Sequence, residues 1–368
     1  IEETIHVKGQ DPVTTKIFVT RHGPIVTETN EESTESILAA RWAFWEVPQS
    51  LQATYRLLKA RDVQEVQEAL RYWLLPGQNV VFADVEGNIG YWCCALIPIR
   101  AKGKGMLPVP GWSGEHEWGG YVPFDERPHL INPVKGFVAT ANNKVAGEDY
   151  PYMISTYWEP SDRITRIRQL LSTARKLSVE DCKRMQLDVY SVRAPEITPQ
   201  LIHALEQRFS DNTAKKAANI LSRWDFRMAE DSVGACLFEV TCRKMMENIF
   251  ADELGKDLFE EYLRTFMFPP RAIRMMIRKA SSPWFDDVTT PATETMEDII
   301  VKSLRQAMSE LTKIMGSDME QWTWGKIHTL TFEHTLGKKK PLHLIFNLGP
   351  FPVGGSHLTV NNKQYPYA

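Results

Sequence analysis

The hydrophobic pattern of this chain changes at residue 161, and this change constrains the fold more than any other feature. Before it, β-branched and aromatic residues form short runs separated by Gly, Pro and Asp, which is typical of strands. After it, apolar residues recur with the 3.6-residue period of an amphipathic helix. That period predicts helices over residues 161–173, 178–187, 194–208, 212–223, 232–250, 257–266, 270–279 and 294–314. Residues 322–332 look β-like again, and residues 341–368 are rich in turns.

This order of sheet, helices and sheet predicts an α+β fold with a helical insertion between sheet segments. We expect a sheet-forming part in residues 1–160, the helical insertion in residues 161–315 and a return to the sheet in residues 316–368. Two separate domains are the less favoured alternative, for which a chain of 368 residues is long enough.

Residues 1–160 are expected to contain short strands, two helices and one long loop. The strands are predicted at residues 5–7, 15–20, 25–27 and 136–141, and the helices at residues 50–60 and 62–73. Residues 79–83 and 88–95 are predicted to form a hairpin around Gly87, because glycine accepts the positive φ of a tight turn. Residues 98–133 are rich in proline and aromatic residues and predict an ordered surface loop.

Composition excludes several classes of function. The 43 Lys and Arg residues nearly balance the 46 Asp and Glu residues, which argues against a surface that binds nucleic acid. No apolar run reaches the roughly 18 residues of a membrane span. The five cysteines form no C-x-x-C pair, so we expect free thiols, most of them buried, and no zinc site.

Five motifs follow one another along the chain. Arg-His-Gly-Pro occupies residues 21–24, Ala-Asp-Val-Glu-Gly-Asn-Ile-Gly-Tyr 83–91, Leu-Pro-Val-Pro-Gly-Trp 107–112, Gly-Phe-Val-Ala-Thr-Ala-Asn-Asn 136–143 and Ser-Asp-Arg-Ile 161–164. In this order and at these spacings they resemble the penicillin acylase family of N-terminal-nucleophile hydrolases. C-terminal landmarks, among them Trp322-x-Trp324 and Gly354-Gly355-x-x-x-Thr359, extend the resemblance over nearly the whole chain.

The resemblance implies an αββα fold and hydrolysis of the amide of an N-acylated small molecule, such as a penicillin-type β-lactam or an acyl-homoserine lactone. In this family the nucleophile is the N-terminal Ser of a β chain released by autoproteolytic processing, and its α-amino group is the base. The implied partners are the α chain and the remainder of the β chain, and the implied location is periplasmic or extracellular. A binding or structural protein that kept the scaffold and lost the chemistry is the rival interpretation.

The first residue is Ile1, which is neither an initiator nor a nucleophile. We therefore expect this chain to be an interior piece of the β chain, with the Ser nucleophile upstream of Ile1 and further strands beyond Ala368. Such a piece is expected to be inactive alone.

Asn142 is the predicted oxyanion donor. Amide hydrolysis needs preorganised donors for the tetrahedral oxyanion, and a side-chain amide is a suitable neutral donor. In the resembled family the first Asn of the Asn-Asn pair has this role, which carries over to Asn142. The alternative is that Asn142 and Asn143 are ordinary turn residues.

Arg163 is the second predicted site residue. It matches the family's arginine that orients the site and assists precursor processing, and a guanidinium can hold a neighbouring group through several fixed donors. The alternative is an ordinary salt bridge to Asp162 or Glu159.

Three further residues match positions that line or support the acyl pocket, namely Thr54, Gln78 and Asn79. Polar side chains there imply a pocket more polar or more open than one shaped for phenylacetyl groups.

The remaining polar motifs are interpreted as structural. His22 is expected to cap backbone groups at a turn, and the acidic stretch of residues 83–88 is expected to be a hairpin tip because it lacks the ligand spacing of a calcium loop. The resemblance implies a structural calcium in penicillin-G-type acylases, but residues 149–154 offer no carboxylate at the matching place. We therefore expect no required cofactor and no metal site. His328 and His334 are expected to be structural.

Overall fold

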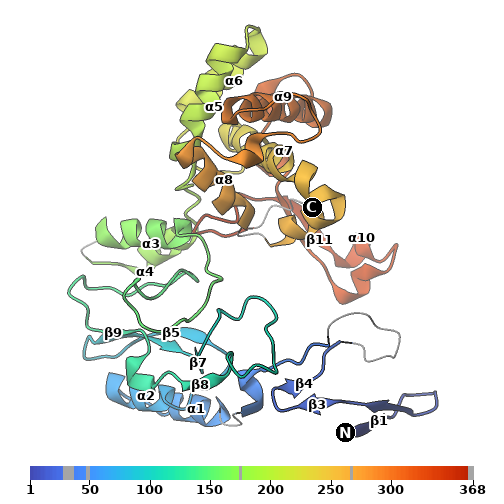
Figure 1. Ribbon diagram of the computed structural model, residues 1–368. Coiled ribbons are helices and arrows are strands. Elements are labelled where there is room, and N and C mark those ends of the chain that lie inside the picture. Colours follow the sequence, from blue (N-terminus) through green and yellow to red (C-terminus); the bar gives the residue numbers. More distant parts are fainter. Residues whose placement is uncertain (28–36, 47–49, 174–175, 266–267, 364–368) are drawn as a thin grey trace. The chain divides into compact units, whose positions relative to one another are not determined.

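The computed structural model describes residues 1–27, 37–46, 50–173, 176–265 and 268–363. The chain forms two compact units, Ile1–Trp158 and Glu159–Ala368, and each is described by itself below. Strands predominate in the first unit and helices in the second (Figure 1). In the described part of the chain, no helix combines the length and the apolar character needed to cross a membrane.

The first unit begins with two small antiparallel pairs of strands. Strand β1 (Glu2–Ile5) pairs with β2 (Val13–Lys16), and β3 (Val19–Thr20) pairs with β4 (Gly23–Pro24). The strand predicted at residues 25–27 is reduced to a single bridge between Ile25 and Ala39.

A short 3-10 helix and two α-helices follow, namely η1 (Ala43–Glu46), α1 (Ser50–Leu57) and α2 (Val63–Leu70). Asp62 caps α2 by accepting a hydrogen bond from the backbone N–H of Glu65, and Glu65 in turn accepts from the backbone of Arg61. Both predicted helices are therefore confirmed, with ends earlier than expected.

A three-stranded antiparallel sheet forms the centre of the first unit. Its order is β5 (Gln78–Ala83), β6 (Ile89–Cys94) and β9 (His129–Ile131). The predicted hairpin is confirmed, with Gly87 at φ 89° in the turn. Because neighbouring residues of a strand point to opposite faces, β6 contributes to two apolar clusters. Trp92 and Cys94 pack with Leu70 of α2, while Tyr91 and Cys93 pack with Ile97 and Val122.

Two expectations for this unit are corrected. The long segment 98–133 is not only a loop, because it contains the antiparallel pair β7 (Pro98–Arg100) and β8 (Trp118–Tyr121), the 3-10 helix η2 (Phe124–Glu126) and β9. Residues 136–141 do not form a strand. Their residues favour extended backbone, but a strand also requires a hydrogen-bonded neighbour, and no described strand pairs with this segment.

The second unit is built mainly from helices around one large core. They are α3 (Asp162–Thr173), α4 (Val179–Gln186), α5 (Ala194–Arg208), α6 (Asn212–Arg223), α7 (Val233–Arg264), α8 (Phe268–Lys279) and α9 (Met296–Met315). Each confirms a predicted helix. Helix α7 covers two of the predicted helices. Gly255, at φ 67°, interrupts its helical geometry between the two predicted segments.

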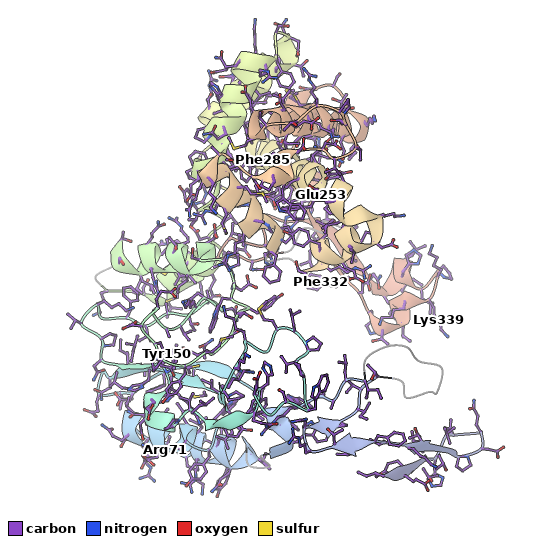
Figure 2. All side chains as sticks on the ribbon, in the orientation of Figure 1. Arg71, Tyr150, Glu253, Phe285, Phe332 and Lys339 are labelled. Carbon is purple, nitrogen blue, oxygen red and sulfur yellow. The ribbon has the colours of Figure 1, made fainter. Side chains whose placement is uncertain are left out.

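Helix α9 illustrates how the sequence specifies these elements. Thr295 and Asp298 form a capping box at its start, and Gly316 ends it at φ 87°. Its buried face includes Ile299, Leu304 and other apolar residues that face α7 and α5. The core between the helices also contains Phe285, which is labelled in Figure 2, from the 3-10 helix η3 (Pro283–Phe285).

The C-terminal part of the second unit returns to strand. The predicted β-like stretch 322–332 is only half correct, because it begins with the 3-10 helix η5 (Trp324–Lys326) and continues as β10 (Thr329–Phe332). Strand β10 pairs with β11 (Leu348–Pro352), and the connection holds η6 (Thr335–Lys338) and α10 (His343–Phe346).

All five cysteines are free, and four of them are buried while Cys182 is exposed. This confirms the expectation that the cysteines are free and mostly buried. Burial raises the pKa of the Cys94, Cys236 and Cys242 thiols to about 12.

Candidate functional site

Asn142 lies in an exposed turn of the first unit and has a left-handed backbone conformation, with φ 61°. Most residues avoid this conformation for steric reasons, whereas Asn tolerates it. The residues on either side, Ala141 and Asn143, are buried. The turn therefore has buried residues on both sides of one exposed asparagine.

The adjacent Asn143 has a different role. Its Oδ1 accepts a hydrogen bond from the backbone N–H of Ala141 (3.1 Å), and its Nδ2 donates to the backbone carbonyl of Lys144 (2.7 Å). The side chain of Asn143 is thus used to brace the turn. Of the Asn-Asn pair, Asn142 is exposed and Asn143 is buried.

The segments that flank the turn are anchored on the central sheet. Val138 and Val145, on the two sides of Asn142, both pack against the cluster of Tyr91, Cys93, Ile97 and Val122. Burial, more than the nearby Cys93, raises the pKa of the Tyr91 phenol well above its usual range. The phenol therefore stays protonated and serves as a hydrogen-bond donor.

Asn79 borders the same cluster. The Tyr91 hydroxyl donates a hydrogen bond of 2.6 Å to Asn79 Oδ1 across the β5–β6 pair. Gln78 precedes Asn79 on β5 and so points to the opposite face of the sheet, where it is exposed. Of these two predicted pocket residues, the structure brings only Asn79 to the face that carries the Asn142 turn.

Thr54, the third predicted pocket residue, lies on α1 with an exposed side chain. The preceding residue, Ala53, is fully buried.

Arg163 belongs to the second unit and lies in the first turn of α3. Its side chain is 16% exposed, and its Nη2 atom lies 3.6 Å from Oε2 of Glu159. The Glu159 pairing that we considered as an alternative is therefore present, but Arg163 does not lie on a solvent-facing surface.

The neighbouring Asp162 turns to a different partner. Both of its carboxylate oxygens accept hydrogen bonds of 3.1 Å from Nη1 of Arg274 on α8, and Arg274 also pairs with Glu196 of α5. Burial raises the pKa of Asp162 despite the neighbouring Arg274. Asp162 thus anchors the start of α3 in the helical core.

His357 is a neighbour of this region that the sequence analysis did not identify. Its Nε2 lies 3.6 Å from the same Oε2 of Glu159, and its side chain is buried. Burial favours the neutral form of Glu159, but His357 and Arg163 outweigh it and keep the pKa of Glu159 below its ordinary value. The only sequence signal for His357 was its position inside the Gly354-to-Thr359 landmark.

The Arg-His-Gly-Pro motif makes polar contacts within the first unit, and those of His22 differ from the ones predicted. His22 Nε2 lies 2.8 Å from a carboxylate oxygen of Glu117, where backbone groups were expected. Arg41 donates to the other oxygen of Glu117 (3.1 Å), and Arg21 donates to the carbonyl of Gly111. These contacts attach the N-terminal strands to the segment 98–133.

The polar tip of the β5–β6 hairpin is closed by its own side chains. Asp84 Oδ1 accepts hydrogen bonds from the backbone N–H groups of Glu86 and Asn88. The Nδ1 atoms of His328 and His334 likewise have backbone partners, in Val353 and Leu336. Among the described residues, no three His, Cys, Asp or Glu side chains gather where they could hold a metal ion.

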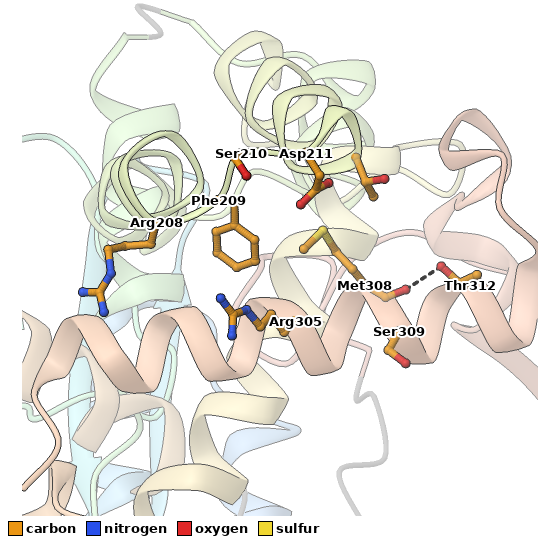
Figure 3. A pocket seen from close by; sticks show the side chains of 9 residues that line it. Arg208, Phe209, Ser210, Asp211, Arg305, Met308, Ser309 and Thr312 are labelled. Carbon is orange, nitrogen blue, oxygen red and sulfur yellow. Dashed lines mark hydrogen bonds between the residues drawn. The ribbon is translucent and has the colours of Figure 1, made fainter. Parts of the chain in front are cut away.

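Figure 3 shows a pocket of about 430 Å³ in the second unit, between the α5–α6 connection and α9. Its polar side chains support the helices. Arg208 pairs with Asp298, Asp211 caps α6 at the N–H of Ala214, and Thr312 donates to the carbonyl of Met308. The pocket includes none of the predicted site residues.

Comparison with known proteins gives a consistent result. The family model described as penicillin amidase matches residues 1–368. Acyl-homoserine lactone acylase QuiP of Pseudomonas fluorescens is 28% identical over 383 residues, which cover 99% of this chain and 46% of that protein. Penicillin acylase 2 proenzyme of a Pseudomonas species is 28% identical over 359 residues, which cover 97% of this chain and 45% of that protein.

The fold also has a solved counterpart. The thermostable penicillin G acylase of Alcaligenes faecalis aligns with a TM-score of 0.70 and 24% identity, over 88% of this chain and 62% of that one. The likeness confirms an α+β fold of the kind found in penicillin G acylase. The chain spans about half the length of the curated relatives it matches.

Proposed function

The chain belongs to the penicillin amidase family, and from this premise we propose that it forms part of an amidohydrolase that cleaves N-acylated small molecules through an acyl-enzyme. The observation that carries the proposal is the Asn142 turn. Asn142 is exposed and has a backbone φ of 61°, and Asn143 hydrogen-bonds to the residues on both sides of the pair. The flanking segments pack on the sheet, so the Asn142 amide is proposed to be a preorganised donor.

In the proposed reaction, the hydroxyl of an N-terminal Ser attacks the carbonyl carbon of the substrate amide, and the α-amino group of that Ser takes the proton. The Ser would come from a segment of the precursor outside residues 1–368. The Asn142 amide donates to the oxyanion of the tetrahedral intermediate. Breaking the C–N bond releases the amine with the transferred proton and leaves an ester, which water then hydrolyses.

Arg163 is proposed to orient groups around this site and not to transfer protons, because a guanidinium remains charged at any working pH. The proposed partners are the α chain and the remainder of the β chain of the same precursor.

We propose acyl-homoserine lactones as the first substrate class to test and penicillin-type β-lactams as the second. One relative named acyl-homoserine lactone acylase matches 99% of this chain, and another named penicillin acylase matches 97%. The half-buried Asn79 and the exposed Thr54 would add polar character to the acyl-binding region.

The test uses the complete precursor gene, expressed and processed, with acyl-homoserine lactones of several chain lengths and with phenylacetyl and glutaryl anilides. Release of the amine, together with an acyl adduct on the N-terminal residue detected by mass spectrometry, is the expected result. A processed protein that binds these amides without cleaving them would support the rival, a scaffold that has lost its chemistry. Residues 1–368 alone are expected to give background rates.

A further inference from the structure

Hydrogen bonds attach the C-terminal segment 354–362 to other parts of the second unit. The backbone N–H of Gly355 donates to the carbonyl of Met228 (2.7 Å), and the indole N–H of the fully buried Trp324 donates to the carbonyl of Gly355 (2.9 Å). Gly355 has φ 88°, a conformation that a side chain would strain. Further along, the backbone N–H of Asn361 donates to the carbonyl of Asp188 (2.9 Å).

Hydrogen bonds within this segment fix His357 itself. The Thr359 hydroxyl accepts from the N–H of Ser356 (2.9 Å) and lies 2.8 Å from the carbonyl of Asn361. Asn362 Nδ2 donates to the carbonyl of His357 (2.6 Å). These hydrogen bonds constrain the backbone at His357, and the imidazole that it carries is buried.

Glu159 lies between this imidazole and Arg163. Its Oε2 is 3.6 Å from Nε2 of His357 and 3.6 Å from Nη2 of Arg163, so that one carboxylate oxygen faces two nitrogen atoms. All three side chains belong to the second unit and are at most 17% exposed. At this degree of burial, solvent screens the charge of Glu159 less than it would at the surface.

We propose that Glu159 and His357 are positioning residues for Arg163. This inference rests on the proposed function, in which Arg163 orients the site. A long arginine side chain on the first turn of a helix has many rotamers, and a fixed counter-charge restricts them. The rigid turn at 354–362 fixes His357, His357 holds the Glu159 carboxylate from one side, and Glu159 orients the guanidinium on the other. The Gly-Gly-x-x-x-Thr landmark thereby gains a function, although it is far from Arg163 in the sequence.

The test compares variants of the complete, processed enzyme. Glu159→Gln keeps the shape and removes the charge, and it should lower kcat by about 10- to 100-fold, as expected when a positioning group shifts by about an ångström. KM should change by less than about threefold. Glu159→Asp keeps the charge and should restore part of the rate, and His357→Gln should give a smaller loss in the same direction.

The decisive measurement is a double-mutant cycle with Arg163→Lys. If Glu159 acts through Arg163, Glu159→Gln should cost little further rate in an Arg163→Lys enzyme. Asp287→Asn is the matched control, because Asp287 is a largely buried carboxylate that pairs with Lys302 of α9 at 2.7 Å. It should lower the melting temperature and leave kcat unchanged.

Two results would overturn the inference, provided that Arg163→Lys alone impairs activity. In the first, Glu159→Gln leaves kcat within twofold of wild type. In the second, Glu159→Gln lowers kcat as much in the Arg163→Lys enzyme as in the wild type. A wild-type enzyme without amidase activity, or an Arg163→Lys enzyme at the wild-type rate, would contradict the proposed function instead. Should Glu159→Gln fail to fold, the His357→Gln cycle decides between the same outcomes.

Discussion

Oδ1 of Asn143 accepts a hydrogen bond of 3.1 Å from the backbone N–H of Ala141, and the backbone of Asn142 forms part of the ring that this bond closes. The two asparagines of the motif are therefore not equivalent. The side chain of Asn143 braces the turn, whereas Asn142 is an exposed residue within it.

Replacing Asn143 with Ala should destabilise the first unit by about 1–3 kcal/mol, because it leaves the buried N–H of Ala141 without its acceptor and removes the bond to Lys144. The free energy of unfolding in urea measures this loss. A variant as stable as the wild type would mean that the turn does not depend on the Asn143 side chain.

Trp324→Phe tests whether the C-terminal turn is anchored as described. The substitution removes the hydrogen bond from the indole to the carbonyl of Gly355 inside the core. We expect a loss of about 1–3 kcal/mol, the usual cost of leaving a buried acceptor without its donor. Because the same turn carries His357, kcat should fall as well. A loss of stability with no change in kcat would mean that the turn does not influence the active site.

Acid should weaken the pairing of Asp287 with Lys302. The hydrogen bonds from Lys302 and Thr289 lower the pKa of Asp287 to about 2, from an ordinary value of 3.8. A pKa lowered in the folded state stabilises the fold above the unfolded pKa, and this contribution is lost as the pH falls from about 4 through about 2. Asp287→Asn should therefore cost about 1–2 kcal/mol at pH 7 and almost nothing near pH 2. Equal losses of unfolding free energy at both pH values would contradict the lowered pKa of Asp287.

Much of the fold could be predicted because its signals are local. The start of α9 follows from the capping pair Thr295 and Asp298, and the break in α7 follows from Gly255 between two apolar patterns. The strand predicted at residues 136–141 failed because a strand depends on a neighbour as well as on its own residues. The 3-10 helix at Trp324 was not predicted, because the aromatic residues there favour strands. Aromatic residues are also common in buried cores outside strands, and Trp324 is one of these.

The candidate site likewise combines residues that local motifs indicate with contacts that they do not. The order of the motifs led to the prediction of Asn142 and Arg163 as site residues. The positive φ of Asn142 is compatible both with an ordinary turn residue and with an oxyanion donor. The contact of His357 with Glu159 joins distant segments, so neither residue's local sequence indicates it. Similarly, the Glu117 partner of His22 lies in a segment that the sequence indicated only as a loop.

The central claim is that Asn142 stabilises the oxyanion of an amide hydrolysis, and the most direct test is kcat of the Asn142→Gly enzyme. Glycine accepts the positive φ of this turn, whereas Ala would add backbone strain to the loss of the amide. We expect kcat to fall by about 10²–10³-fold, the effect of deleting one oxyanion donor, with the unfolding free energy changed by less than about 1 kcal/mol. A kcat within about threefold of the wild type, in an enzyme that folds and is processed normally, would make Asn142 a turn residue and contradict the account.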